Sequence, residues 1–260
     1  MKKTWLTNAI HLNPLPSEKK IFFASDFHLK SGYTAKNTTR EEKIVTWLSS
    51  IQEEAHALFL LGDIFDFWIE HKHVIPKGFI PFQHKILAFK ARNIPVYFFA
   101  GNRDLWATAH FQKELGAIVL DQPTSFSIDN KSFLVGHGDT LNMTKAYSFC
   151  RKMYTNAFFK WIIRNIHPNI VISLAYALIN KNRENYKKKS FLKERDRIFI
   201  HCKEHIVPYW HHDFYIFGHT HMPCCIPIDE NSNYCNLGDW VDHYTYGVFD
   251  GTSLRPVTYK

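Results

Sequence analysis

The stretch Leu60-Leu61-Gly62-Asp63-Ile64-Phe65-Asp66-Phe67-Trp68 is an apolar run that stops at a glycine and is followed at once by a carboxylate. An apolar run of this length predicts a buried strand. A glycine at its end lets the backbone turn tightly, so that the next side chain can approach a ligand. We therefore expect Asp63 to be held at the end of a strand.

The same arrangement occurs four more times, each time as an apolar run that ends in polar side chains. The polar blocks are Asp26-Phe27-His28, Asn102-Arg103-Asp104, His137-Gly138-Asp139 and His219-Thr220-His221. Carboxylate, amide and imidazole groups together suit borderline-hard divalent cations. We interpret the five blocks as a site for two such ions, with Asp63 as the best candidate to bridge them.

Helical periodicity alternates with these strands in the first half of the chain. Apolar residues at helical spacing predict helices over residues 39–56, 82–92 and 107–115. Residues 125–128 and 131–135 predict a hairpin, residues 234–259 are rich in strand-forming residues, and residues 1–20 resemble a loose lead-in. The pattern favours an α/β fold in which two mixed sheets pack together between helices.

The strand pattern is interrupted over residues 144–208, between His137 and His219. Two apolar helices are expected there, at residues 158–166 and 170–179, separated by His167-Pro168-Asn169. Neither has the eighteen or more uninterrupted apolar residues of a membrane-spanning helix. We expect residues 1–143 and 209–260 to form the main domain and residues 144–208 a helical cap. A hairpin packed on the core and a groove for an apolar ligand are both open interpretations of this cap.

Composition and charge describe a folded chain with one unusual segment. Its 260 residues are 45% hydrophobic and 16% aromatic, which fits one α/β domain with an insertion. Residues 151–197 hold twelve Lys or Arg against three acids, a balance of +9, so the rest carries −1 of the formal +8. This segment predicts an anionic partner, and a solvated helix face is the alternative.

Cysteine usage and the N-terminus bear on the compartment. Five cysteines show no paired spacing, which favours reduced thiols in a cytosol. Polar residues and two prolines interrupt the N-terminal apolar residues, so we expect no signal peptide.

The five blocks, in this order, resemble the calcineurin-like metallophosphoesterases, whose motifs run Asp-x-His, Gly-Asp, Gly-Asn-His-Asp/Glu, His and Gly-His-x-His. The resemblance implies a four-layer αββα sandwich and two divalent ions, which we expect to be Mn²⁺. It implies that one ion is held by Asp26, His28, Asp63 and His221, and the other by Asp63, Asn102, His137 and His219. No nucleophilic serine or cysteine arrangement and no glycine-rich phosphate loop is present, so a metal-bound hydroxide is the expected nucleophile.

Arg103 departs from the histidine of most of that superfamily. Arginine cannot donate a proton at ordinary pH but can bind phosphate oxygens through two hydrogen bonds. Gly101-Asn102-Arg103-Asp104 is similar to the motif of the UDP-2,3-diacylglucosamine diphosphatases of lipid A biosynthesis. That resemblance extends to Tyr147 and Arg151, whereas Arg183-Glu184-Asn185-Tyr186 departs from the expected Arg-x-x-Ser.

This second resemblance implies hydrolysis of UDP-2,3-diacylglucosamine to UMP and 2,3-diacylglucosamine 1-phosphate. It implies catalytic roles for Asp63, Asn102 and Arg103, and substrate contacts from Arg103, Tyr147 and Arg151. We expect a lipid-nucleotide substrate, no nucleic acid partner, and a cytoplasmic enzyme held peripherally on an anionic inner-membrane surface. The alternatives are a metallophosphoesterase that acts on a nucleotide, phosphoprotein or nucleic acid, and a non-catalytic scaffold.

Three further groups are expected to support the site. Asp66 is interpreted as a carboxylate that orients a metal ligand, with a helix N-cap as the alternative. We expect Asp104 to orient Arg103 or a histidine. Asn236-Leu237-Gly238-Asp239-Trp240 resembles the family's closing motif and is expected to support the ligand loop. The other histidines lack this context and are taken as structural: His11, His56, His71, His73, His84, His110, His167, His201, His205, His211, His212 and His243.

Overall fold

The computed structural model describes residues 9–32, 34–186 and 196–260. Its strands form two six-stranded sheets, a first sheet in the order β12-β11-β2-β3-β4-β5 and a second in the order β1-β6-β7-β8-β10-β9. The first sheet contains β2 (Lys20–Ala24), β3 (Ala55–Leu60), β4 (Val96–Phe99), β5 (Ile118–Leu120), β11 (Thr245–Phe249) and β12 (Leu254–Thr258). The second contains β1 (Ile10–His11), β6 (Thr124–Ile128), β7 (Lys131–Val135), β8 (Phe214–Phe217), β9 (Cys224–Pro227) and β10 (Asn233–Asn236).

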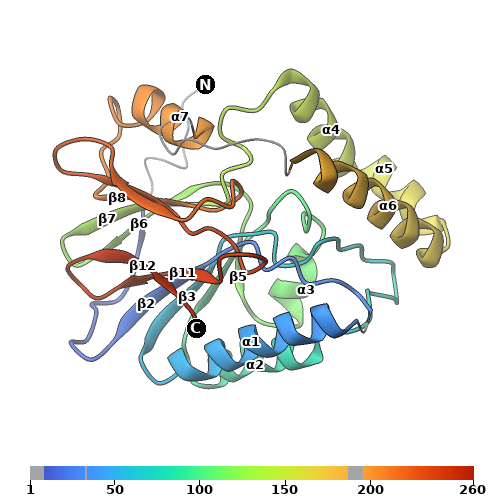
Figure 1. Ribbon diagram of the computed structural model, residues 1–260, viewed down its shortest axis with the longest axis horizontal. Helices are drawn as coiled ribbons and strands as arrows, with labels where there is room; N and C mark the ends of the chain where they lie inside the picture. The colour runs from blue at the N-terminus through green and yellow to red at the C-terminus, as the bar shows by residue number, and fades with distance from the viewer. Residues whose placement is uncertain (1–8, 33, 187–195) are drawn as a thin grey trace.

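The two sheets pack face to face between two layers of helices (Figure 1). The outer face of the first sheet is covered by α1 (Ala35–Ile51), α2 (Ile80–Ala91) and α3 (Thr108–Lys113), and the second sheet is covered by α7 (Arg197–His205). This confirms the expected αββα sandwich of two mixed sheets.

Alternation along the central strands builds two separate cores. Phe22 faces the helices and packs in one buried cluster with Trp47, whereas Phe23 faces the second sheet and stacks on Phe59 with ring centroids 4.9 Å apart. Because both faces of β2 and β3 are buried, these strands are apolar at almost every position. The pairs β2–β3 and β3–β4 are parallel, so all three strands end at the same edge of the sheet.

Most elements lie close to their predicted positions, but three short strands were missed. The helices expected at 39–56, 82–92 and 107–115 are α1, α2 and α3, and the hairpin is the antiparallel pair β6–β7. The missed strands are β1, β5 and β9, and the lead-in is not loose throughout because β1 pairs with β6. β1 and β5 have two and three residues, too few to show a period, and the four-residue β9 ends in a proline, which weakens a strand signal.

The expectation that all cysteines are reduced is wrong for this structure. Cys225 and Cys235 face each other across the antiparallel pair β9–β10, with Cα atoms 4.1 Å apart, and form a disulfide. Their ten-residue separation conceals this pairing, because only the register of a strand that was not predicted places them side by side.

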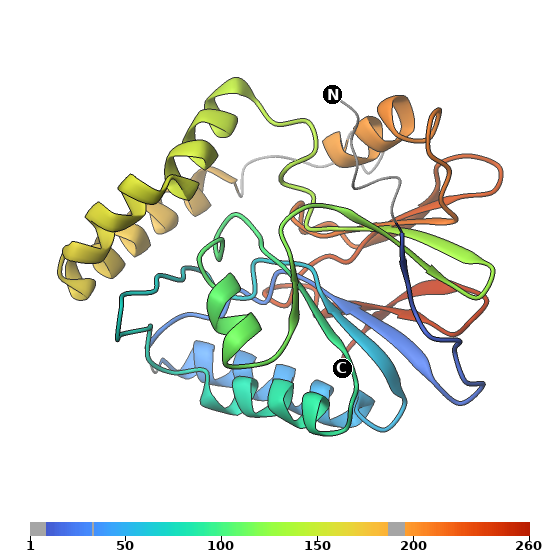
Figure 2. The same cartoon turned by 180° about the vertical axis from the view of Figure 1, so that it is seen from behind.

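Three helices of the 144–208 region project beside the sandwich, namely α4 (Lys145–Thr155), α5 (Ala157–Asn165) and α6 (Pro168–Tyr186) (Figures 1 and 2). We call these three helices the cap. One side of the cap packs on the body through Phe159, Ile163, Val171 and Ile172. Hydrogen bonds add to this contact: Trp106 Nε1 donates to the Tyr154 carbonyl at 2.9 Å, and Tyr176 Oη accepts from the Ser31 amide at 2.9 Å. The fourth helix of the region, α7, instead buries Ile198 and Phe199 against the second sheet.

The cap leaves many apolar side chains in solvent. Neither α4 nor α5 contains a buried residue. The exposed apolar residues include Phe149, Met153, Phe158, Trp161, Ile170, Leu174 and Leu178. Such a surface is not that of a hairpin packed into a core. No single described helix is long and apolar enough to cross a membrane, although α5 and residues 168–180 pass that test jointly as a pair bent by 114°.

Candidate metal centre

Five charged or imidazole side chains converge where β2, β3 and β8 end, and all five have an unusual backbone. Their φ angles are positive, at 56° for Asp26, 48° for His28, 51° for Asp63, 67° for His219 and 59° for His221. A non-glycine residue in this region costs roughly 1–3 kcal/mol and persists only where the surroundings impose it. The fold therefore holds these side chains in strained positions, as is common at functional sites.

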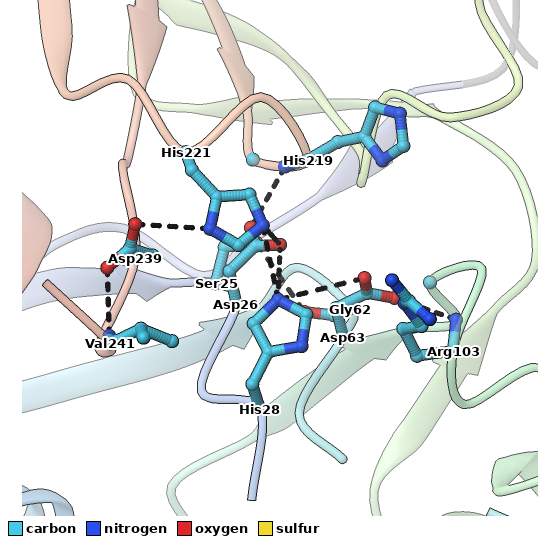
Figure 3. Close-up of polar contacts among 12 residues, drawn as sticks. Ser25, Asp26, His28, Gly62, Asp63, Arg103, His219, His221, Asp239 and Val241 are labelled. Atoms are coloured by element: carbon cyan, nitrogen blue, oxygen red, sulfur yellow. Dashed lines mark hydrogen bonds and ion pairs between the residues drawn. The ribbon is translucent and has the colours of Figure 1, made fainter. Parts of the chain in front are cut away.

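The first cluster joins Asp26, His28 and His221 (Figure 3). The Asp26 Oδ1 atom lies 3.4 Å from His28 Nε2 and 3.3 Å from His221 Nε2, and the two Nε2 atoms are 3.2 Å apart. Asp26 Oδ1 is buried and accepts no hydrogen bond, which is costly unless a cation lies against it. Asp63 Oδ2 is 3.9 Å from His28 Nε2, so a fourth ligand is adjacent.

The second cluster joins Asp26, Asp63 and His137, and so shares Asp26 with the first. Asp63 contributes the remaining carboxylate. Its Oδ1 atom lies 3.5 Å from His137 Nε2, and the same nitrogen lies 3.3 Å from Asn102 Oδ1. The His219 ring lies beside the His137 ring, with centroids 5.1 Å apart, and its backbone amide donates to Asp26 Oδ2 at 2.9 Å. Asp63 thus lies between His28 and His137, with one carboxylate oxygen toward each. Its role as a bridge between two ions stays a prediction.

The outward-facing nitrogens of three histidines are already engaged. His28 Nδ1 contacts Asp66 Oδ1 at 2.8 Å, His221 Nδ1 contacts Asp239 Oδ2 at 3.1 Å, and His137 Nδ1 contacts the Leu61 carbonyl at 2.6 Å. These contacts place a proton on Nδ1 and aim Nε2 inward, the arrangement of a metal-binding histidine once a cation replaces any proton on Nε2. The orienting role expected of Asp66 and the supporting role expected of Asp239 are both confirmed.

The electrostatics also favour bound cations. Burial would lower the pKa of His28, but Asp26 and Asp66 raise it to about 10. Burial also acts to raise the pKa of Asp26, yet His221, His28 and His137 hold it below its ordinary value. The carboxylates therefore create a negative potential at the centre of the site, and the donor set fits divalent metal ions.

Two glycines permit the close approach of the loops. Gly62 has a φ of 81°, and a Cβ there would lie 2.6 Å from the Gly101 amide nitrogen. A Cβ on Gly101 would lie 2.2 Å from Asp63 Oδ1. Any other residue at these positions would push the Asp63 loop away from the Asn102 loop.

Comparison with known proteins agrees with this geometry. Residues 19–223 match the model of the calcineurin-like phosphoesterase family. The chain belongs to that family. Among curated relatives, it is 32% identical to the UDP-2,3-diacylglucosamine hydrolase of Porphyromonas gingivalis, over 90% of this chain and 95% of that protein. It is 29% identical to the protein of that name from Proteus mirabilis, over 89% of this chain and 94% of that protein, and 28% identical to that of Histophilus somni, over 85% and 92%.

In this phosphoesterase, Asp104 holds two loops together. Its carboxylate accepts from the amides of Ile64 at 2.7 Å and Gly101 at 2.8 Å, with longer contacts to the amides of Asp63 and Phe65. The expectation that Asp104 orients Arg103 or a histidine is therefore wrong. Backbone donors that come together only in the fold could not be seen in the sequence.

Arg103 is half-buried beside the bridging carboxylate (Figure 3). Its backbone amide donates to Asp63 Oδ1 at 2.9 Å, which fixes the residue next to the site. A guanidinium on this loop can approach a phosphate bound to the metals without being a metal ligand itself.

Tyr147 and Arg151 of α4 both contact the phosphoesterase site through Asp139. Asp139 Oδ2 accepts from Tyr147 Oη at 2.6 Å and from Arg151 Nη1 at 2.7 Å, and Asp139 is two residues beyond His137. The use of these side chains as substrate contacts stays a prediction. The side chains of residues 181–186 and all of residues 187–195 lie outside the described part, and with them the Arg183-Glu184-Asn185-Tyr186 departure.

Proposed function

We propose that the chain hydrolyses the diphosphate of UDP-2,3-diacylglucosamine, releasing UMP and 2,3-diacylglucosamine 1-phosphate for lipid A biosynthesis. The observation that carries the proposal is the pair of candidate ligand groups, Asp26-His28-His221 and Asp26-Asp63-His137, with Arg103 fixed beside Asp63. The names of the curated relatives support the choice of substrate.

The bound ions would supply a water-derived nucleophile at neutral pH and offset charge on the phosphoryl oxygens. Asp26, His28, Asp63 and His221 would hold one ion, and Asp63, Asn102, His137 and His219 the other, with Mn²⁺ as the expected metal. Arg103 would bind the phosphoryl oxygens and stabilise the charge that develops as the diphosphate breaks. Asp63 and Asn102 would contribute to catalysis by holding the ions. Tyr147 and Arg151, which both contact Asp139 beside the site, would bind the substrate.

The cap would take the acyl chains and place the enzyme on a bilayer. Its exposed Phe158 and Trp161 rings stack with centroids 6.0 Å apart, and Lys152, Lys160 and Arg164 belong to the same helices. Apolar side chains among cations suit the surface of an anionic membrane, where a helix lies without crossing it. We propose on this basis that the enzyme works at the cytoplasmic face of the inner membrane, and we expect no nucleic acid partner.

The direct test is a hydrolysis assay with purified protein, Mn²⁺ and UDP-2,3-diacylglucosamine in detergent micelles. UMP and the diacylated sugar 1-phosphate should appear in equal amounts. In ¹⁸O-water, the phosphate of only one of these two products should carry ¹⁸O, because water attacks a single phosphorus atom. UDP-N-acetylglucosamine and a dinucleotide serve as comparison substrates. Faster cleavage of a substrate that lacks acyl chains would contradict the assignment.

A further inference from the structure

The loop that carries His219 and His221 is held by side chains that do not belong to the expected metal ligands. The Asn236 Nδ2 group donates to the Gly218 carbonyl at 2.7 Å and to Thr220 Oγ1 at 2.8 Å. The Thr220 hydroxyl in turn donates to Asp196 Oδ2 at 3.1 Å. Thr220 lies between two histidines with left-handed backbones, so its position sets the direction of both imidazoles.

Asp196 is well placed to hold Thr220 rigidly. Its side chain is 1% exposed, and its Oδ2 atom also accepts from Tyr234 Oη at 2.7 Å. Its Oδ1 atom accepts from the Ile198 amide at 2.8 Å and so caps the N-terminus of α7. Because α7 is buried on the second sheet (Figure 1), the carboxylate cannot move without disturbing that helix.

We propose that Asp196 is a positioning residue, which acts through Thr220 to hold His219 and His221 in their strained, metal-binding geometry. The left-handed backbone at these histidines costs free energy, and a buried, fully hydrogen-bonded side chain network can offset it. The inference rests on the metal assignment of the proposed function but not on the identity of the substrate. It gives a role to the aspartate at which the chain returns from the cap region to the body.

Thr220→Val is the decisive variant, because valine keeps the shape of threonine and removes the hydroxyl. We expect the Mn²⁺ dissociation constant of the metal-stripped protein, measured by calorimetry, to rise roughly tenfold, as is usual when a group that supports a metal ligand is lost. The absorption spectrum of the Co²⁺ form should change, because the imidazole directions change. Thr220→Ser should restore both measurements, since serine keeps the hydroxyl.

Asp196→Asn tests the same contact from the other side and should weaken Mn²⁺ binding to a similar degree. Asparagine retains the helix cap, so α7 should remain folded. Asp213→Asn is the matched control: Asp213 accepts from the Ser132 amide at 2.9 Å and from its hydroxyl at 2.7 Å, but at the opposite end of β8. We expect its Mn²⁺ affinity to stay within twofold of the parent.

Wild-type Mn²⁺ affinity and an unchanged Co²⁺ spectrum in Thr220→Val would overturn the proposal. Thr220→Val also removes the bond from Asn236, so Asn236→Ala separates the two contacts: a loss of Mn²⁺ affinity in Asn236→Ala as large as in Thr220→Val would assign the effect to Asn236 and overturn the role of Asp196. Failure of the parent protein to cleave UDP-2,3-diacylglucosamine would count against the proposed function alone, because metal affinity is measured without substrate.

Discussion

At the scale of single residues, the proposed two-metal site depends most on the carboxylate that lies between His28 and His137. Asp63 lies 3.9 Å from His28 Nε2 through one oxygen and 3.5 Å from His137 Nε2 through the other. Asp63→Ala should lower bound metal from two ions to one or none and reduce turnover by several orders of magnitude, because two cations would repel each other without the bridge. Metal counting by mass spectrometry checks this. Two retained ions with near-normal turnover would contradict the bridging role.

Arg103 gives a prediction of the opposite kind, in which turnover falls but metal stays. Arg103→Ala should lower kcat/KM on the diphosphate roughly 100-fold, the range for loss of one charge-stabilising donor, with two ions still bound. Arg103→Lys should recover only part of the rate, because an ammonium cannot form the two parallel bonds of a guanidinium. Full activity in the alanine variant would remove Arg103 from the mechanism.

At the scale of elements, a buried histidine joins β6 to the start of β8. His212 Nε2 contacts Ser125 Oγ at 2.9 Å, and His212 Nδ1 contacts the Trp210 carbonyl at 3.2 Å, which leaves the ring neutral with its proton on Nδ1. Burial, together with His211, lowers the pKa of His212 to about 4. The strand junction therefore disfavours protonation of this ring.

The folded pKa of His212 lies below its unfolded value of 6.5, so between pH 6.5 and 4 the unfolded chain binds more protons. Stability from this group is complete above pH 6.5 and is lost as the pH falls. His212→Gln keeps an acceptor for Ser125 but does not titrate. Compared with the parent, its free energy of unfolding should fall less from pH 7 to pH 4.5, by roughly 2–3 kcal/mol. Urea unfolding at both pH values measures this difference. If the free energy of unfolding fell equally in the parent and in His212→Gln, the assignment would be refuted.

A feature could be predicted from the sequence where several neighbouring residues form its pattern, and could not where its residues lie far apart along the chain. The strands before Asp26, Asp63 and Asn102 are long apolar runs, so their existence and the order of the ligands could be predicted. The roles of Asp104, Asp139 and Asp196 could not, because their partners come from distant segments and only the packed structure brings them within hydrogen-bond distance. The Cys225–Cys235 pair was missed for the same reason.

At the scale of the whole molecule, the cap presents apolar rings to solvent. Phe158 is 68% exposed and Trp161 is 61% exposed. Replacing both with serine should weaken binding to vesicles of phosphatidylglycerol and phosphatidylcholine at least tenfold, because each ring contributes on the order of 2 kcal/mol when it leaves water. Cosedimentation at two salt concentrations measures the fraction of protein bound to the vesicles. For the parent protein, this fraction should fall as the salt concentration rises.

Ile80→Ser is the matched control for the cap variant. Ile80 is 70% exposed, but it begins α2, which covers the outer face of the first sheet and is not part of the cap (Figure 1). Its substitution should leave vesicle binding and the unfolding midpoint unchanged. Equal loss of binding in Ile80→Ser and in the cap variant would mean that the cap is not the membrane surface.

The route of the chain from β7 to β8 has a consequence for the history of the fold. These strands are parallel neighbours, so the chain must cross over between them, and α7 already packs on the second sheet along that route. The cap helices α4, α5 and α6 are therefore surplus to the crossover. Ancestors could have gained, lengthened or exchanged them without shifting the register of any strand. The length and sequence of the cap helices can therefore vary while the strands that carry the metal centre keep their pairing.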